Sequence, residues 1–357
     1  MTTLHDAPAP GAEAAPSAAA LTPRRRTGRW IDDWTPEDPQ FWENGGRQVA
    51  RRNLLWSIFA EHLGFSVWLI WSVSAAMLGA QFGYTPQQLF FLVAAPNLVG
   101  ALIRVPYTFA VPKFGGRNWT IVSALLLLIP TVLYVIAVQD TSTPYWVMVL
   151  IAATAGLGGG NFASSMANIN AFYPADKKGA ALGLNAAGGN VGVAVIQFLL
   201  PVIVGAAGIF GLVKASEGGV HLERAGWVYV GLALVAAAAA YFFMNNLGTA
   251  VGSTKETAAV VKRKQTWVMS FLYIGTFGSF IGYSAAFPTL LKAVFDRGDI
   301  ALAWAFLGAG IGSVARPLGG KLSDHYGGAR ITALSFVMLA VLVGITLKPA
   351  YIAFGPE

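Results

Sequence analysis

The sequence predicts an all-α protein that crosses a membrane many times, and three observations support this. Of the 357 residues, 55% are hydrophobic and only 11% are charged, with a mean hydropathy of +0.57. A soluble domain carries roughly a quarter of charged residues. Apolar stretches long enough to span the hydrocarbon core as helices, about 20 residues each, recur along the chain. Most of the Lys and Arg residues fall in the short segments between these stretches.

Nine stretches qualify as spans, over residues 54–80, 89–111, 119–138, 145–173, 180–204, 227–244, 267–291, 300–322 and 331–347. With the N-terminus in the cytoplasm, 17 of the 24 Lys and Arg residues lie on the cytoplasmic side, five lie outside and two lie within spans. Cytoplasmic loops carry the excess of positive charge in membrane proteins. We therefore expect a multi-pass protein of the inner (plasma) membrane with a cytoplasmic N-terminus.

The chain divides into four segments. Residues 1–53 form a cytoplasmic tail, in which the Ala/Pro-rich residues 1–23 are expected to be disordered and residues 30–53 to lie along the membrane surface. Residues 54–245 hold the first six spans. A charged cytoplasmic linker, residues 246–266, separates them from the three spans of residues 267–357.

Two arginines lie inside apolar spans, and their surroundings repeat. Arg104 and Arg316 are 212 residues apart, and each is followed 11 residues later by a Gly-Gly pair. Each lies in the second span of its part of the chain. This indicates a parallel repeat of six-helix units, so we expect twelve spans in the complete form, with the second half truncated here.

The paired arginines predict a site for an anion. A charge in the hydrocarbon region is costly and usually faces a cavity or a substrate path, and neither span contains an acid. A guanidinium is planar, permanently charged and offers paired donors to an oxyanion. At 1.5 Å per residue, Arg104 lies about 13 Å from Lys113 and Arg316 about 12 Å from Asp324, so their depths match. The alternative is that each arginine extends to the cytoplasmic interface.

Glycine-rich runs occupy residues 156–161 and 183–192. Glycine allows helices to approach closely, and it also exposes backbone amides and the side chains of Asn185 and Asn190 to a ligand. Both interpretations stay open. A phosphate-binding loop is excluded because neither run ends in Gly-Lys-Ser/Thr.

Phe162, Tyr273 and Phe277 are candidate walls for a flat anion, although most aromatic residues in spans pack against helices or face lipid. Tyr273 and Phe277 are spaced i, i+4 and share a helix face. In the first span, Glu61 and His62 form a candidate proton carrier. The alternative is an interfacial pair near the cytoplasmic end.

Several function classes are excluded or disfavoured. Cysteine is absent and the four histidines are scattered, so we expect no metal centre, no cofactor and no enzyme or electron-transfer activity. The net charge of +7 lies in short loops rather than on one surface, which disfavours nucleic acid as a partner.

Four segments together resemble the nitrate/nitrite porter family of the major facilitator superfamily. They are Arg104–Tyr107, Gly159–Asn168, Gly183–Gly192 and Thr276–Gly282. The third is similar to the family's nitrate signature, with Gly183, Gly188, Gly189 and Gly192. A fifth segment, with Gly320, Asp324, Gly327 and Arg330, resembles the superfamily's cytoplasmic gating motif, whereas its first-half counterpart, residues 112–117, lacks the acid. The resemblance covers roughly residues 30–350.

The resemblance implies a major facilitator-type fold, a monomeric unit in the lipid bilayer, and transport of nitrate and nitrite by alternating access. The implied substrate contacts are Arg104, Arg316, Asn190, Phe162, Tyr273 and Phe277. Two departures stand out. The family's second signature, in span eleven, is not present in this chain, and the family's central site resembles a purely cationic one, so that Glu61 is unexpected.

Nitrate/nitrite antiport is the favoured hypothesis, because two unpaired arginines repel each other when no anion is bound. Nitrate/proton symport through Glu61, with or without His62, is the alternative. From another class, the chain could be an anion-binding membrane module without transport activity, or an inactive fragment.

Overall fold

The computed structural model describes residues 29–206, 208, 210–250 and 258–354. Within these residues, nine helices are long and apolar enough to cross a membrane, which confirms the all-α polytopic fold class. The expected disordered tail, residues 1–23, and Lys255 in the linker lie outside the described residues.

The first six spans form one bundle, and several of them consist of two helices in succession. They are α2 (Arg47–Trp68) with α3 (Ile70–Phe82), α4 (Pro86–Thr108), α6 (Gly116–Leu126) with α7 (Leu128–Gln139), α8 (Tyr145–Thr154) with α9 (Gly156–Phe172), α10 (Ala175–Ile203) and α11 (Glu223–Phe243). The short α5 (Ala110–Phe114) follows α4. Pro130 accounts for the break at Leu127, because proline has no N–H to donate to the carbonyl four residues earlier.

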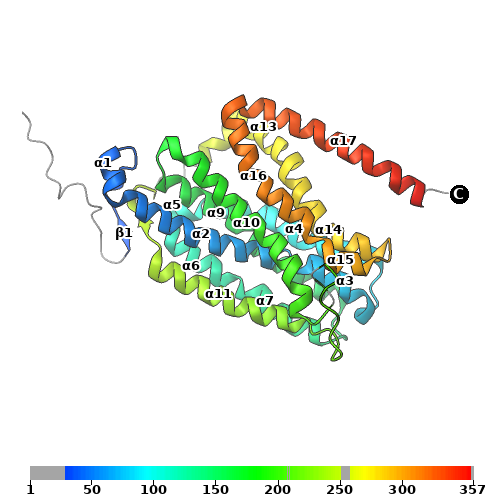
Figure 1. The fold of residues 1–357 in the computed structure, drawn as a ribbon. Coiled ribbons are helices and arrows are strands. Elements are labelled where there is room, and N and C mark those ends of the chain that lie inside the picture. The colour runs from blue at the N-terminus through cyan, green and yellow to red at the C-terminus, as the bar shows by residue number, and fades with distance from the viewer. Residues whose placement is uncertain (1–28, 207, 209, 251–257, 355–357) are drawn as a thin grey trace, which may run out of the picture.

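The last three spans begin with α13 (Lys264–Tyr273), a π-helical turn η5 (Ile274–Gly278) and α14 (Ser279–Ala293). They continue with α15 (Gly298–Trp304), α16 (Phe306–Tyr326) and α17 (Gly328–Phe354). Figure 1 shows α17 at the edge of the bundle, where it packs mainly against α16. The repeat predicted from the two Gly-Gly pairs is visible in the backbone: Gly115 and Gly327 end corresponding helices with φ of +84° and +92°, values that favour glycine.

The N-terminal segment folds against the bundle as a structure that we call the cap, residues 29–46 with residues 244–250. Its strands β1 (Trp30–Ile31) and β2 (Asn246–Leu247) pair in parallel, and it contains α1 (Pro39–Phe41), η2 (Trp42–Gly46) and the 3-10 turn η3 (Gly248–Ala250). A second such turn, η4 (Val260–Lys262), precedes α13. Figure 1 shows the cap at one end of the bundle, which we call the cap side.

The aromatic residues of the cap are buried rather than spread on the membrane surface, contrary to the sequence prediction for residues 30–53. Trp34, Phe41 and Trp42 form a buried cluster with Phe172, and the Trp34 indole N–H donates to the Phe172 carbonyl at 3.2 Å. The helix that carries the first predicted span, α2, begins at Arg47, before the expected start of the span at residue 54.

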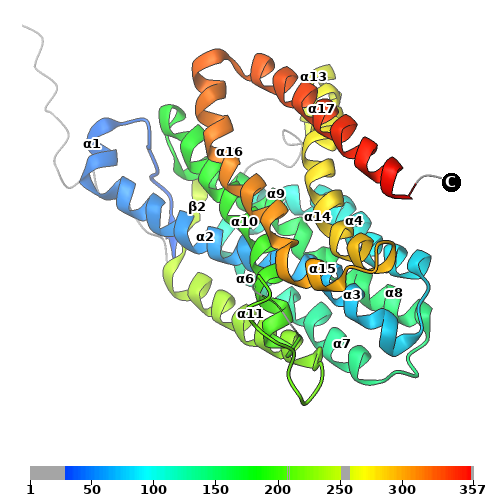
Figure 2. The same cartoon turned by 45° about the vertical axis from the view of Figure 1, so that its right-hand side comes forward.

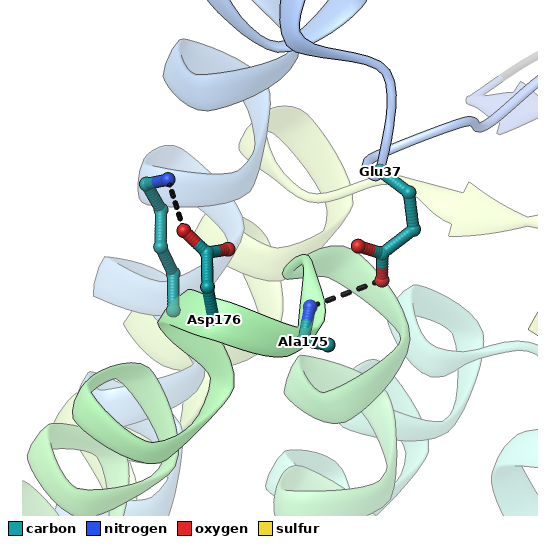
Figure 3. A network of polar contacts seen from close by, with 4 residues as sticks. Glu37, Ala175 and Asp176 are labelled. Carbon is teal, nitrogen blue, oxygen red and sulfur yellow. Dashed lines mark hydrogen bonds and ion pairs between the residues drawn. The ribbon is translucent and has the colours of Figure 1, made fainter.

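The cap reaches the start of α10 through Glu37. One Glu37 carboxylate oxygen accepts a hydrogen bond from the Ala175 N–H at 3.0 Å, beside Asp176 (Figure 3). A carboxylate is favourable there, because the first N–H groups of a helix have no partner within the helix. The cap therefore contacts α10 at its N-terminal end through this hydrogen bond.

The two parts of the bundle meet on the side away from the cap. The Ser72 hydroxyl of α3 donates to the Ala285 carbonyl of α14 at 2.7 Å, and the Gln197 amide of α10 donates to the Ser284 carbonyl, also at 2.7 Å. Figure 2 shows α10 lying between α2 and α16. This places α10 at the boundary between the parts.

Candidate functional site

Arg104 extends from α4 into the bundle interior. Its Nε–H donates to the Gly159 carbonyl of α9 at 3.2 Å. Its guanidinium lies over the rings of Phe277 at 4.6 Å and Phe162 at 4.9 Å, measured from Cζ to the ring centroid. A cation within about 6 Å of an aromatic face is attracted to it. The charged group is therefore held among the helices rather than at a membrane surface.

Arg316 comes from α16 and reaches the same two rings. Its Cζ lies 5.8 Å from the Phe162 centroid and 5.8 Å from the Phe277 centroid. Two residues that are 212 positions apart in the sequence thus meet at one aromatic pair. No ion pair among the described residues involves either arginine.

The aromatic residues of the site are stacked on one another. Tyr273 and Phe277 have centroids 5.0 Å apart with planes at 4°, and Phe162 and Phe277 have centroids 5.6 Å apart with planes at 27°. The π-helical turn η5 lies between Tyr273 and Ser279, so this helix widens at the site. The Tyr273 hydroxyl and Arg104 Nη2 are both buried, and neither makes a hydrogen bond among the described residues.

A cavity of about 420 Å³ lies next to this stack, between α10, η5, α16 and α17. Arg316, Asn190, Tyr273 and Phe277 line it, as does Ser323 toward the end of α16. Asn190 is buried, and its side-chain oxygen has no hydrogen-bond partner in the described part of the chain. Arg104 contacts the same rings but does not line the cavity.

Glu61 lies in a separate polar cluster within the first six spans and is 0% exposed. One of its oxygens accepts hydrogen bonds from Ser165 Oγ at 2.5 Å and from Asn185 Nδ2 at 2.7 Å. Ser57 Oγ lies 2.9 Å from Ser165 Oγ. Glu61 therefore lies among α2, α9 and α10, and not at the interface that the sequence left as an alternative.

The second Glu61 oxygen has no hydrogen-bond partner among the described residues. It lies 2.4 Å from the position that a Cβ would take at Gly189, so it packs directly on the α10 backbone. His62 points elsewhere: its Nδ1 lies 3.2 Å from the Gly188 carbonyl. The two neighbours in sequence therefore contact adjacent residues of α10, Gly188 and Gly189, through separate contacts.

Ser57 and Ser165 are members of this cluster that sequence reasoning missed. The available signal was the adjacent pair Ser164-Ser165, two hydroxyls in a glycine-rich span that also contains asparagines. Buried hydroxyls require hydrogen-bond partners, and such a pair points to a polar neighbour on another helix.

Three of the four signature glycines allow α10 to lie directly against α2. A Cβ at Gly188 would lie 2.4 Å from an Ile58 methyl carbon, and a Cβ at Gly192 would lie 2.2 Å from the His62 carbonyl oxygen. Gly189 faces Glu61 in the same way, whereas no atom of the described residues lies within 4 Å of a Cβ placed at Gly183.

The residues that resemble a gating motif lie at the end of α16 and the start of α17. Gly320, Gly327 and Arg330 are exposed, and the side chain of Asp324 lies outside what the structure describes. Within the described residues, no group of three or more His, Asp or Glu side chains is arranged to hold a metal ion.

Residues 54–354 match the family model of the Major Facilitator Superfamily. The nitrate/nitrite transporter NarU of Salmonella typhimurium is 43% identical over 321 residues, which cover 88% of this chain and 69% of that protein. The NarU protein of Escherichia coli is 42% identical, with 90% of this chain and 71% of that protein covered. The probable nitrate/nitrite antiporter NarK2 of Thermus thermophilus is 38% identical, with 90% and 75% covered.

The fold is also similar to that of a solved transporter. The structure is a bacterial homologue of the human lysosomal transporter Spinster in an inward-facing, occupied conformation, with a TM-score of 0.53 at 18% identity. The match covers 76% of this chain, which spans 60% of the solved chain. Together, these findings show that the chain belongs to the nitrate/nitrite transporter family of the major facilitator superfamily.

Proposed function

We propose that this protein moves nitrate and nitrite across the membrane by alternating access, as an exchanger of the two anions. The single observation that carries the proposal is the convergence of Arg104 and Arg316 on the rings of Phe162 and Phe277. Two cations on a flat aromatic pair suit a small planar anion, because the guanidinium edges donate in the plane while the rings cover its faces. Asn190 adds a donor on the cavity wall.

The electrostatics of the site favour exchange. The two guanidinium carbons lie 4.6 and 5.8 Å from the same Phe277 centroid, so they are at most 10.4 Å apart. At this upper limit, about 10 Å, two unit charges repel by roughly 1.7 kcal/mol at an effective dielectric constant of about 20, and a shorter separation increases the repulsion. A singly charged anion about 5 Å from each cation gains roughly 3.3 kcal/mol from each on the same scale. The empty site therefore resists closure and the loaded site favours it, as differential stabilisation requires.

The contacts between the two parts of the bundle fit one state of the alternating-access cycle, closed on the side away from the cap and open on the cap side. Hydrogen bonds and the Phe198–Phe306 ring contact, with centroids 4.8 Å apart, lie on the side away from the cap. The cavity at Arg316 extends toward the cap side. With the cap in the cytoplasm, as the distribution of positive charge predicts, the site would take up its anion from the cytoplasm.

Exchange is tested with proteoliposomes that are either empty or loaded with nitrite. We expect labelled nitrate to accumulate in loaded vesicles much faster than in empty ones, because only a loaded carrier returns readily. Equal uptake in both would contradict exchange. Nitrate binding by calorimetry without flux in either preparation would instead support the anion-binding module.

Nitrate/proton symport is a second candidate, and the position of Glu61 is the specific observation in its favour. The carboxylate is fully buried, has one oxygen without a hydrogen-bond partner among the described residues, and packs on Gly189, the neighbour of Asn190. A proton on Glu61 would make the site more positive and would raise its affinity for an anion.

The two modes differ in their response to a pH gradient. Under symport, an inward proton gradient accelerates nitrate uptake, and Glu61→Gln abolishes the acceleration while preserving the side-chain volume. Under exchange, neither the gradient nor the substitution matters to the coupling. Glu43→Gln, at an exposed position in the cap, is the matched control and leaves the gradient response unchanged in both cases.

A further inference from the structure

A groove between α2 and α10 on the cap side has no role in anion transport as proposed above. It has a volume of about 640 Å³ and lies at the start of α2. Its polar end is lined by Gln48, Arg51 and Arg52, and its apolar part by Leu54, Leu55, Ile58 and Leu184. The groove is separate from the cavity at Arg316, which has no lining residue in common with it.

The wall of this groove changes from polar to apolar along the helix axis. Arg51 to Ile58 is about 10 Å along α2 at the helical rise of 1.5 Å per residue. Leu55 and Leu184 remain 60% and 53% exposed, although they come from two helices that are otherwise in close contact. The exposed apolar wall and the polar end therefore belong to the same groove.

The polar end of the groove is cationic. Arg51 is exposed and makes no ion pair with a carboxylate in the described residues. Arg47 lies one turn earlier on α2, and the adjoining pocket of about 520 Å³ contains Arg47, Arg51 and the single acid Glu43. The charge at this end is therefore positive after Glu43 is taken into account.

We propose that this groove binds an acidic phospholipid, with the phosphate at Arg51 and Gln48 and an acyl chain along Leu55, Ile58 and Leu184. Arg51 lies just before the apolar run that starts at Leu54, which predicts a position near the headgroups, where a basic residue attracts anionic lipid by about 1 kcal/mol. The apolar wall continues from there toward the hydrocarbon core. A phospholipid has the same order of anionic head and apolar tail, so one molecule can contact both parts of the groove, whereas a free anion would contact only its polar end.

The proposed lipid would bridge two helices that matter for the site. It would contact α2, which carries Glu61, and α10, which carries Asn190 and packs against α16. The inference concerns binding and does not depend on the transported anion.

The test measures lipid binding to the purified full chain by native mass spectrometry, with phosphatidylglycerol and phosphatidylcholine as probes. We expect phosphatidylglycerol to bind in preference, and Arg51→Gln to weaken its binding about fivefold, the equivalent of about 1 kcal/mol. Leu55→Gln is expected to weaken both lipids by removing part of the apolar wall. Arg263→Gln, at an exposed position before α13, is the matched control and retains the preference.

Three results would overturn the proposal. The first is equal binding of the two lipids, and the second is an equal loss in Arg51→Gln and Arg263→Gln, which would indicate unspecific attraction. The third is complete competition by millimolar inorganic phosphate, which would identify the ligand as a free anion. A circular dichroism melt of each variant separates loss of binding from loss of folding.

Discussion

Replacing Arg104 by lysine tests whether the site needs a guanidinium or only a positive charge. Lysine keeps the charge, so the Coulomb attraction of the anion is preserved. It loses the planar pair of donors and the orientation given by the Arg104 Nε–H bond to Gly159 and by the rings beneath it. A hydrogen bond to a charged group contributes about 1.5–3 kcal/mol. We therefore expect Arg104→Lys to weaken nitrate binding by roughly 10- to 150-fold.

The assay is isothermal titration of nitrate into the purified protein, with Arg104→Gln and Arg117→Lys measured alongside. Arg104→Gln also removes the charge, and we expect a further loss of roughly 3 kcal/mol for a contact at about 5 Å. Arg117→Lys is the matched control, because Arg117 donates to the Tyr241 carbonyl outside the site, and its affinity should not change. If Arg104→Lys binds nitrate within twofold of the unsubstituted protein, the guanidinium clamp is wrong.

Four further substitutions test the helix packing, the cap and the buried carboxylate. Gly192→Ala would put its methyl group against the His62 carbonyl at 2.2 Å and should lower stability by about 1–3 kcal/mol. At Gly183 a new Cβ would have no neighbour within 4 Å among the described residues, so Gly183→Ala should leave the stability unchanged or raise it by up to about 1 kcal/mol. Equal melting temperatures of the Gly192→Ala and Gly183→Ala proteins would refute the packing role of Gly192. Trp34→Ala should lower the free energy of unfolding by about 3–5 kcal/mol, which a lower melting temperature would reveal. An unchanged melting temperature would mean that the cap contributes little to stability. Ser165→Ala removes the shorter of two hydrogen bonds to a buried carboxylate and should cost about 1–3 kcal/mol in thermal unfolding; a neutral result would mean that water replaces the hydroxyl.

The transmembrane part of the fold was predictable because its signals are local. Each span is a continuous apolar run, and the turns at Gly115 and Gly327 repeat because both require a positive φ. The meeting of Arg104 and Arg316 was also predictable, since the internal repeat places both at one depth. These inferences need only the helical rise and the position of each residue within its own span.

The cap and the Glu61 cluster were not predictable in the same way, because their contacts join distant parts of the chain. Trp34 binds a carbonyl 138 residues away, and Glu61 binds side chains 104 and 124 residues away. From the sequence, the aromatic and charged segment of residues 30–53 was predicted to lie along the membrane surface. In the fold, the same aromatic residues find an apolar surface inside the protein, which removes more of their area from water.

The glycine signature contained one signal that separates its two asparagines. Residues Asn185, Gly188, Gly189 and Gly192 follow the spacing i, i+3, i+4, i+7, which defines one face of an α-helix. Asn190 lies off this face, about 140° from Asn185 at 100° per residue. The structure agrees: Asn185 and the three glycines face α2, whereas Asn190 lines the cavity with Arg316. One helix therefore presents a packing face to Glu61 and an amide to the cavity that Arg316 lines, so that under the proposed function α10 links Glu61 to the anion site.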